Sequence, residues 1–163
     1  MPLIAPEFGN LAGPPSLDTC TRDVYAAHAR FDWPATLRMA FGIASATQHL
    51  HARGILHGDL YAHNILHTKR GDALLSDFGA AAFFDVNHAA LALGLEKLEV
   101  RALGCLLEEL AAHCHAEQDS ARKQEGLAQL AQLAQQCMHN DPAMRPGLAY
   151  VCAMLEALRA PAS

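Results

Sequence analysis

The fold is decided by the stretch His57-Gly58-Asp59-Leu60-Tyr61-Ala62-His63-Asn64 and by Asp77-Phe78-Gly79, whose first residue lies thirteen positions after Asn64. Phosphoryl transfer needs a carboxylate that orients the attacking hydroxyl, and oxygen ligands that hold Mg²⁺ against the phosphates. Two Asp residues and one Asn can supply these groups. The spacing of Asp59, Asn64 and Asp77 therefore favours a phosphoryl-transfer cleft over isolated cap or turn residues.

The residues between the two motifs predict a small β-hairpin. Two short apolar pieces, at 64–66 and 73–75, are separated by the polar run 68–72. Such a hairpin folds the chain back on itself. We therefore expect Asn64 and Asp77 to converge on one cleft.

Helical periodicity dominates the remainder of the chain. Apolar residues recur at three- and four-residue steps from Pro34 to Gly54, and a Pro suits the first turn of a helix. The segment 1–30 is rich in Pro and Gly, so we expect loop there, with one short extended piece at Leu3 and Ile4. Three further helices are predicted, at about 95–113, 125–137 and 147–158.

Length and composition favour one soluble globular unit. Of the 163 residues, 52% are hydrophobic and 18% are charged. No apolar stretch approaches the roughly 20 residues of a membrane span, and no secretory signal is present, so we expect a cytoplasmic protein without a membrane partner. The net charge of −5, without a Lys/Arg cluster, argues against nucleic acid. The five scattered cysteines indicate reduced thiols.

Together the two motifs resemble the catalytic loop and the metal-binding loop of protein kinases. The resemblance covers about residues 1–158. Residues 98–110 are similar to the buried central helix of the kinase lower lobe, and 137–146 are similar to a late turn that carries Asp-Pro and Arg-Pro. The implied fold is protein-kinase-like and of the α+β class, a mainly α-helical C-terminal lobe with one or two short β-hairpins.

The resemblance assigns chemistry to the matching residues. Asp59 would be the catalytic base that accepts the proton of a substrate hydroxyl, and Asn64 and Asp77 would bind Mg²⁺. The cofactors implied are ATP and Mg²⁺. The nucleotide would be bound by Leu3, Ile4, Leu66 and Asp77.

Other matching residues would support the site. His57 and Phe78 would pack together, and Arg145 would form a buried ion pair, for which Glu96 is the best candidate partner. The residues expected in such supporting roles are His57, Phe78, Gly79, Glu99 and Arg145.

Four departures from the kinase pattern limit these implications. The chain begins where the kinase hinge would lie, so we expect the N-terminal lobe to be absent, 1–163 to be a partial kinase domain and 1–30 to be its loop-rich hinge segment. Gly58 replaces the usual Arg, as in some bacterial kinases, and Tyr61 stands where Ser/Thr kinases usually have Lys. Only about twenty residues, without Ala-Pro-Glu, separate Gly79 from the central helix.

The leading hypothesis is ATP- and Mg²⁺-dependent transfer to a protein hydroxyl, with Ser or Thr favoured, by the C-terminal lobe of a larger or split kinase. Alone, the chain is expected to bind ATP weakly or not at all, and to be inactive or very weakly active without an N-terminal lobe. One alternative is a pseudokinase, a non-catalytic module that associates with a missing lobe or partner protein through an uncovered cleft floor. The floor would be formed by Leu3, Ile4, Ile65, Leu66 and Leu75. The second alternative is a small-molecule kinase of the aminoglycoside or choline type, which the His-Gly-Asp sequence also resembles.

Overall fold

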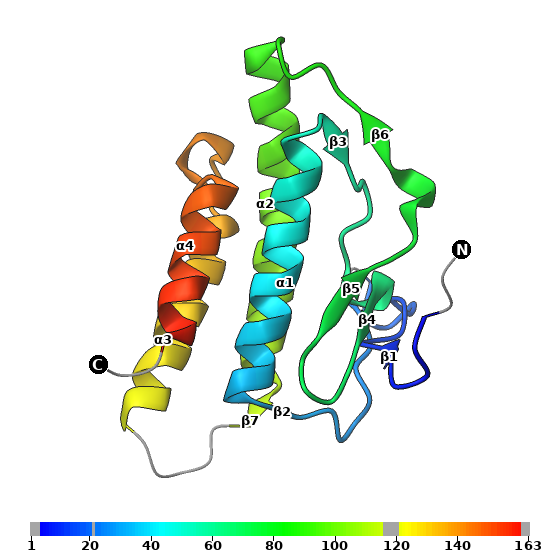
Figure 1. Ribbon diagram of the computed structural model, residues 1–163, viewed down its shortest axis with the longest axis vertical. Helices are drawn as coiled ribbons and strands as arrows, with labels where there is room; N and C mark the ends of the chain where they lie inside the picture. Colours follow the sequence, from blue (N-terminus) through cyan, green and yellow to red (C-terminus); the bar gives the residue numbers. More distant parts are fainter. Residues whose placement is uncertain (1–3, 21, 116–120, 161–163) are drawn as a thin grey trace.

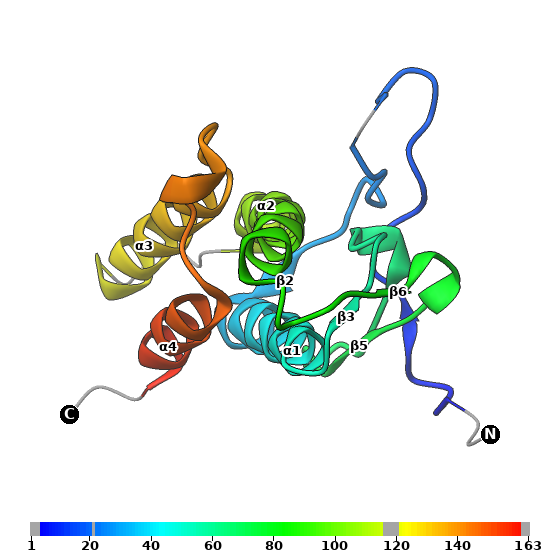
Figure 2. The same cartoon turned by 90° about the horizontal axis from the view of Figure 1, so that it is seen from above.

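The computed structural model describes residues 4–20, 22–115 and 121–160. Within these residues the chain forms four α-helices and seven strands of two or three residues, so the fold is mainly helical. The helices stand side by side, and most of the short strands lie on the far side of α1 from α3 and α4 (Figure 1, Figure 2). The helices are α1 (Trp33–His51), α2 (Ala89–Ala112), α3 (Ala121–Cys137) and α4 (Leu148–Arg159).

Helix α1 confirms the helix predicted from Pro34. Asp32 caps its start, because Oδ1 of Asp32 accepts a hydrogen bond from the Ala35 N–H at 2.7 Å, and Pro34 occupies the first turn. The buried face of α1 includes Ala40, Ile43 and Ala44. This face packs against α4 and α2 and so forms part of the helical core.

The hairpin between the two motifs is present. Strand β4 (Ile65–His67) pairs with β5 (Ala73–Leu75) in antiparallel register, with Ile65 opposite Leu75. Strand β1 (Gly9–Asn10) pairs antiparallel with the other edge of β4 and completes a three-stranded sheet. The remaining pairs are β3 (Ile55–Leu56) with β6 (Ala82–Phe83), antiparallel, and β2 (Phe31–Asp32) with β7 (Cys114–His115), parallel.

Helix α2 is the central helix, as expected, but it begins at Ala89 rather than near residue 95. The added turns contain several Ala residues, which have high helix propensity, and they expose Leu91 and Leu93 instead of burying them. Further along, Leu103, Leu107 and Leu110 are fully buried and face α1 and α3. Each such burial stabilises the fold by roughly 1.5–3 kcal/mol. None of the helices in the described part of the chain is long and apolar enough to span a membrane.

Two predictions for the N-terminal segment and the cleft floor need correction. Leu3 lies outside the described residues, and Ile4 belongs to no strand, since the first strand is formed by Gly9 and Asn10. Ile65 is fully buried and not open to water. The segment that contains β1 and Leu11 lies along β4, and the Leu11 N–H donates a hydrogen bond to the Ile65 carbonyl oxygen at 2.9 Å. Leu66 and Leu75 are half-buried.

Candidate functional site

The segment that resembles a catalytic loop connects β3 to β4 and is fixed from behind by His57. This side chain is completely buried, its Nε2–H donates to the Ser76 carbonyl oxygen at 2.8 Å, and its Nδ1 accepts from the Asp59 N–H at 3.3 Å. These partners require the proton to be on Nε2. The loop is thereby tied to the residue that precedes Asp77.

Asp59 and Asn64 are in direct contact. The Asn64 Nδ2 group donates to the Asp59 carbonyl oxygen at 2.9 Å and to Asp59 Oδ2 at 2.8 Å. Asn64 is buried, whereas the Asp59 side chain is 40% exposed. One carboxylate oxygen is therefore held by Asn64, while Oδ1 accepts no hydrogen bond from any described residue and remains available to a substrate.

Asp77 reaches the same site through the hairpin. The N–H and the hydroxyl of Ser76 both donate to the Asn64 carbonyl oxygen, each at 2.8 Å, and Asp77 follows immediately. The φ angle of Asp77 is 54°, and its Oδ1 accepts from the Gly79 N–H at 3.1 Å. Asp tolerates this left-handed conformation better than most residues. The structure thus places Asp59, Asn64 and Asp77 at the open end of the β4–β5 hairpin. Their catalytic and metal-binding roles stay predictions.

Phe78 contacts His57, as expected. The two ring centroids are 4.8 Å apart in an edge-to-face arrangement. His57 is fully buried, but Phe78 is 49% exposed. Phe78 also lines a shallow groove of about 480 Å³ between α1 and β5, which Leu74 and Leu75 share.

Glu99, on α2, holds the loop from the helical side. Its Oε1 accepts from the Gly58 N–H at 2.6 Å, and its Oε2 lies 2.6 Å from His51 Nε2 on α1. Both side chains are almost completely buried. Gly58 itself has a φ of 80°, and a Cβ atom there would lie 2.3 Å from the Ala80 carbonyl oxygen. The absence of Arg at this position therefore has a steric cause in this fold.

Arg145 does not form the predicted ion pair with Glu96. Its guanidinium donates instead to two backbone carbonyl oxygens, those of Lys97 and His139, both at 2.8 Å. Lys97 Nζ in turn donates to the Arg145 carbonyl oxygen. Arg145 thus supports the lobe by joining the third turn of α2 to the segment between α3 and α4, and among the described residues no carboxylate pairs with it.

Sequence reasoning missed three side chains that hold the loop, namely His51, Ser76 and Asp23. The carboxylate of Asp23, whose side chain is 1% exposed, accepts from the His63 backbone N–H at 2.9 Å and from its Nδ1–H at 2.8 Å. The position of Ser76 beside Asp77 was a usable signal. Asp23 and His51 are separated from their partners by 40 and 48 residues, so no local pattern could have revealed them.

The donor atoms at the site suit Mg²⁺ in type. Asn64 and Asp77 offer amide and carboxylate oxygens, which Mg²⁺ prefers, and this ion commonly takes one or two protein ligands and completes its shell with phosphate and water. Within residues 4–20, 22–115 and 121–160, no group of three or more His, Cys, Asp or Glu side chains is arranged to hold a metal by itself. Ile4 and Leu66, expected beside a nucleotide, line neither of the two pockets described here.

Comparison with known proteins identifies similar sequences and one similar fold. The chain is 42% identical over 58 residues to CBL-interacting protein kinase 22 of Oryza sativa subsp. japonica, a match that covers 36% of this chain and 13% of that one. It is 26% identical over 87 residues to the probable serine/threonine-protein kinase glkA of Dictyostelium discoideum, covering 43% and 18% of the two chains. The chain therefore spans less than a fifth of the length of these relatives.

A solved structure shares the fold. It is described as a divergent kinase that lacks the glycine-rich loop and regulates membrane ultrastructure of the Toxoplasma parasitophorous vacuole. The TM-score is 0.58 at 20% sequence identity, over 78% of this chain and 47% of the other. The family model for protein tyrosine and serine/threonine kinases matches residues 16–103, which is more than half of the chain and includes both motifs. The chain belongs to the protein tyrosine and serine/threonine kinase family.

Proposed function

We propose that this chain provides the catalytic-loop portion of a protein kinase that transfers the γ-phosphoryl group of ATP to a Ser or Thr hydroxyl with the help of Mg²⁺. One observation carries the proposal. The carboxylate of Asp59 is held by Asn64, and Asn64 is joined through Ser76 to Asp77. An arrangement with only a structural role has no evident need for this combination of an exposed carboxylate and oxygen ligands.

The chemistry follows from the two oxygens of Asp59. Oδ2 is occupied by the Asn64 amide, so Oδ1 accepts the hydrogen bond of the substrate hydroxyl and then its proton. The hydroxyl oxygen forms a bond to the γ-phosphorus as the bond from that phosphorus to the β,γ-bridging oxygen breaks, and ADP leaves. Asn64 and Asp77 would hold Mg²⁺, which when bound neutralises charge on the phosphates.

The acceptor and the partner are inferred from different features. The similarity to probable serine/threonine-protein kinases of Dictyostelium discoideum favours a Ser or Thr hydroxyl over Tyr. The groove between α1 and β5 exposes Leu74 and Phe78 beside Asp77, and such an apolar surface favours cover by a kinase N-terminal lobe or by a partner protein. The cytoplasm, where ATP is present, is the location we propose.

Incubation of the protein, completed by a kinase N-terminal lobe, with radiolabelled ATP, Mg²⁺ and a library of Ser- and Thr-containing peptides tests the function. We expect transfer that falls about a hundredfold or more in Asp59→Asn, because the base is lost, while Mg-ATP binding persists. Asp77→Asn should lose both transfer and Mg-ATP binding. Glu156→Gln is the control, because it makes the same change from carboxylate to amide at an exposed position on α4 that lines neither pocket, and it should retain both.

Two other outcomes would replace the proposal. Mg-ATP binding without transfer to any acceptor would identify a binding module of the pseudokinase type, whereas no binding of Mg-ATP would leave the chain a non-catalytic scaffold. Transfer to aminoglycosides or choline, but not to peptides, would identify a small-molecule kinase. Transfer that is unchanged in Asp59→Asn would remove Asp59 from the mechanism.

A further inference from the structure

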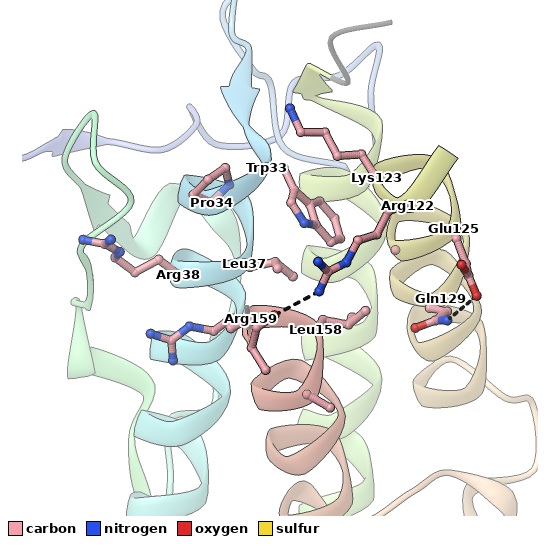
Figure 3. A pocket seen from close by; sticks show the side chains of 13 residues that line it. Trp33, Pro34, Leu37, Arg38, Arg122, Lys123, Glu125, Gln129, Leu158 and Arg159 are labelled. Carbon is pink, nitrogen blue, oxygen red and sulfur yellow. Dashed lines mark hydrogen bonds between the residues drawn. The ribbon is translucent and has the colours of Figure 1, made fainter. Parts of the chain in front are cut away.

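A pocket of about 600 Å³ lies apart from the candidate site, where the start of α1, the start of α3 and the end of α4 meet (Figure 3). Neither Asp59, Asn64 nor Asp77 lines it. Its volume is within the range of roughly 300–1,000 Å³ that is usual for small-molecule sites. Nothing in the phosphoryl-transfer chemistry proposed above uses this pocket, so its function must be sought in its own lining.

The inner wall of the pocket is apolar and contains the single tryptophan of the chain. Trp33 lies in the first turn of α1, and Leu37 and Leu158 lie beside it. The edge of the Trp33 indole packs on Gly126 of α3, where a Cβ atom would lie 2.7 Å from the ring. Gly126 therefore allows α3 to approach the indole closely, and Trp33, which is half-buried, still contributes surface to the pocket.

The rim is positively charged, although the protein is acidic overall. Among the described residues, four of the twelve Lys and Arg residues of the chain line this pocket together with a single acidic residue, Glu125, in a chain with a net charge of −5. The carboxylate of Glu125 accepts a hydrogen bond from Gln129 at 3.4 Å. The four basic residues are Arg38, Arg122, Lys123 and Arg159.

The arginines of the rim differ in the groups that they already contact. Arg38 forms an ion pair with Asp72 at 3.5 Å. Arg159 lies over the Phe41 ring, 4.5 Å from its centroid, and Arg122 Nη2 donates to the Ala160 carbonyl oxygen at 3.3 Å. Neither Arg122 nor Arg159 contacts a carboxylate among the described residues. In Figure 3 the Arg122 guanidinium extends from α3 across the pocket towards α4, on the side where Trp33 also lies.

We propose that this pocket binds a small organic anion with an apolar body. The body lies against Trp33 and Leu158, and a carboxylate or phosphate group is bound by the Arg122 guanidinium, whose planar fork suits both groups. The charge of Arg159 adds to the attraction. An apolar wall with one side of the rim positively charged selects for such a ligand over an uncharged molecule or a bare inorganic ion.

The position of Trp33 provides the measurement, because Trp33 is the single tryptophan of the chain and lines this pocket. The intact chain is titrated with phenylbutyrate and, in parallel, with the uncharged phenylbutyramide, which has the same apolar body. We expect saturable quenching or a spectral shift with the anion, and binding of the amide that is weaker by about tenfold or more, since a charge-assisted hydrogen bond is lost. Phenyl phosphate distinguishes a phosphate-selective site from a carboxylate-selective one, and tighter binding of either anion supports the proposal.

Two matched variants assign the effect to Arg122. Arg122→Gln should weaken binding of the preferred anion by about tenfold or more. Arg53→Gln is the control, because Arg53 is also exposed and also donates to a backbone carbonyl, that of His49 at 3.2 Å, but lies just beyond the opposite end of α1, about 28 Å away. Circular dichroism checks that both variants are folded.

Three results would overturn the proposal. The first is no saturable response to phenylbutyrate or to phenyl phosphate at concentrations up to about 10 mM, because a specific site of this kind is expected to bind its ligand more tightly than that. The second is equal binding of phenylbutyrate and its amide, or of inorganic phosphate and phenyl phosphate. The third is anion affinity that is the same in folded Arg122→Gln as in the unmodified protein.

Discussion

Gly58 is the single residue at which this chain departs most clearly from its family, and its geometry explains why. With φ at 80° and a potential Cβ only 2.3 Å from the Ala80 carbonyl oxygen, no side chain fits without movement of the segment that follows Asp77-Phe78-Gly79. The Arg that is usual in kinases would therefore be strained at this position.

We predict that Gly58→Arg lowers the free energy of unfolding by about 2 kcal/mol or more, because it combines a steric clash with an unfavourable backbone conformation. Urea unfolding followed by circular dichroism measures this change. Gly42→Ala is the control, since Gly42 lies in α1 and a methyl group there would meet no neighbouring side chain or segment within 4 Å, and it should raise stability by up to about 1 kcal/mol. Equal stability of Gly58→Arg and the unmodified protein would contradict the steric explanation.

Glu99, on α2, contacts both His51 of α1 and the Gly58 N–H through one buried carboxylate. Replacement by Ala leaves His51 and the Gly58 N–H buried without a partner, so we predict a loss of about 3–5 kcal/mol in the free energy of unfolding. Double-mutant analysis with His51→Ala, by urea unfolding, should give a coupling energy of about 1 kcal/mol or more. Strictly additive losses would show that the pair does not act as a unit.

The residues of the site were predictable to different degrees. Asp59, Asn64 and Asp77 lie within nineteen consecutive residues, so their spacing and the intervening hairpin pattern were enough to place them together. The contacts of Glu99 with His51 and of Asp23 with His63 depend on tertiary packing and leave no local pattern in the sequence. The partner of Arg145 was wrongly predicted because backbone carbonyls, which every residue has, satisfy its guanidinium.

Among the elements, the helices and the β4–β5 hairpin follow from periodicity and turn residues, whereas the strand pairs that close the fold do not. Strands β1, β2, β3, β6 and β7 have two residues each, too few for an alternating pattern, and all of them pair with distant segments.

The irregular segment between β1 and β2 is attached to α2 by ion pairs and a hydrogen bond. Arg22 pairs with Glu108 and Glu109, and the Tyr25 hydroxyl donates to Glu109 at 3.2 Å.

This attachment to α2 should depend on pH. Burial raises the pKa of Glu109 above its usual value of 4.5, although hydrogen bonds from Arg22 and Tyr25 act in the opposite direction. The folded state therefore keeps this proton at pH values where the unfolded state has lost it, so the contribution of Glu109 to stability is full below about pH 4.5 and is lost as the pH rises through the folded pKa.

We predict that Glu109→Gln destabilises the protein more at low pH than at neutral pH, because the neutral amide does not incur the cost of ionisation that the buried carboxyl incurs as the pH rises. Urea unfolding of both proteins across this range measures the difference. Glu108→Gln removes a half-exposed partner of the same Arg22 and serves as the comparison. If the loss in the free energy of unfolding caused by Glu109→Gln is constant or grows as the pH rises, the raised pKa of Glu109 is contradicted.

Across the molecule, the helices form a rigid support on one side, and the chemistry-bearing loops lie on the other (Figure 2). The core formed by α1, α2, α3 and α4 positions Glu99 and, through it, the loop that contains Gly58 and Asp59. The exposed Asp59, Asp77 and Phe78 lie at the surface that this support presents. This division is what a lower kinase lobe requires, since substrates must reach the loops while the loops keep their geometry.

Calorimetric titration of the protein with Mg-ATP, with Asp77→Asn as the paired variant, tests most directly whether this surface is a working nucleotide site. We predict saturable binding, in about the millimolar range, that needs Mg²⁺ and disappears in the folded Asp77→Asn protein. Binding that is equal with and without Mg²⁺, or equal in the two proteins, or absent from both, would contradict the proposal that Asn64 and Asp77 hold the metal and its nucleotide.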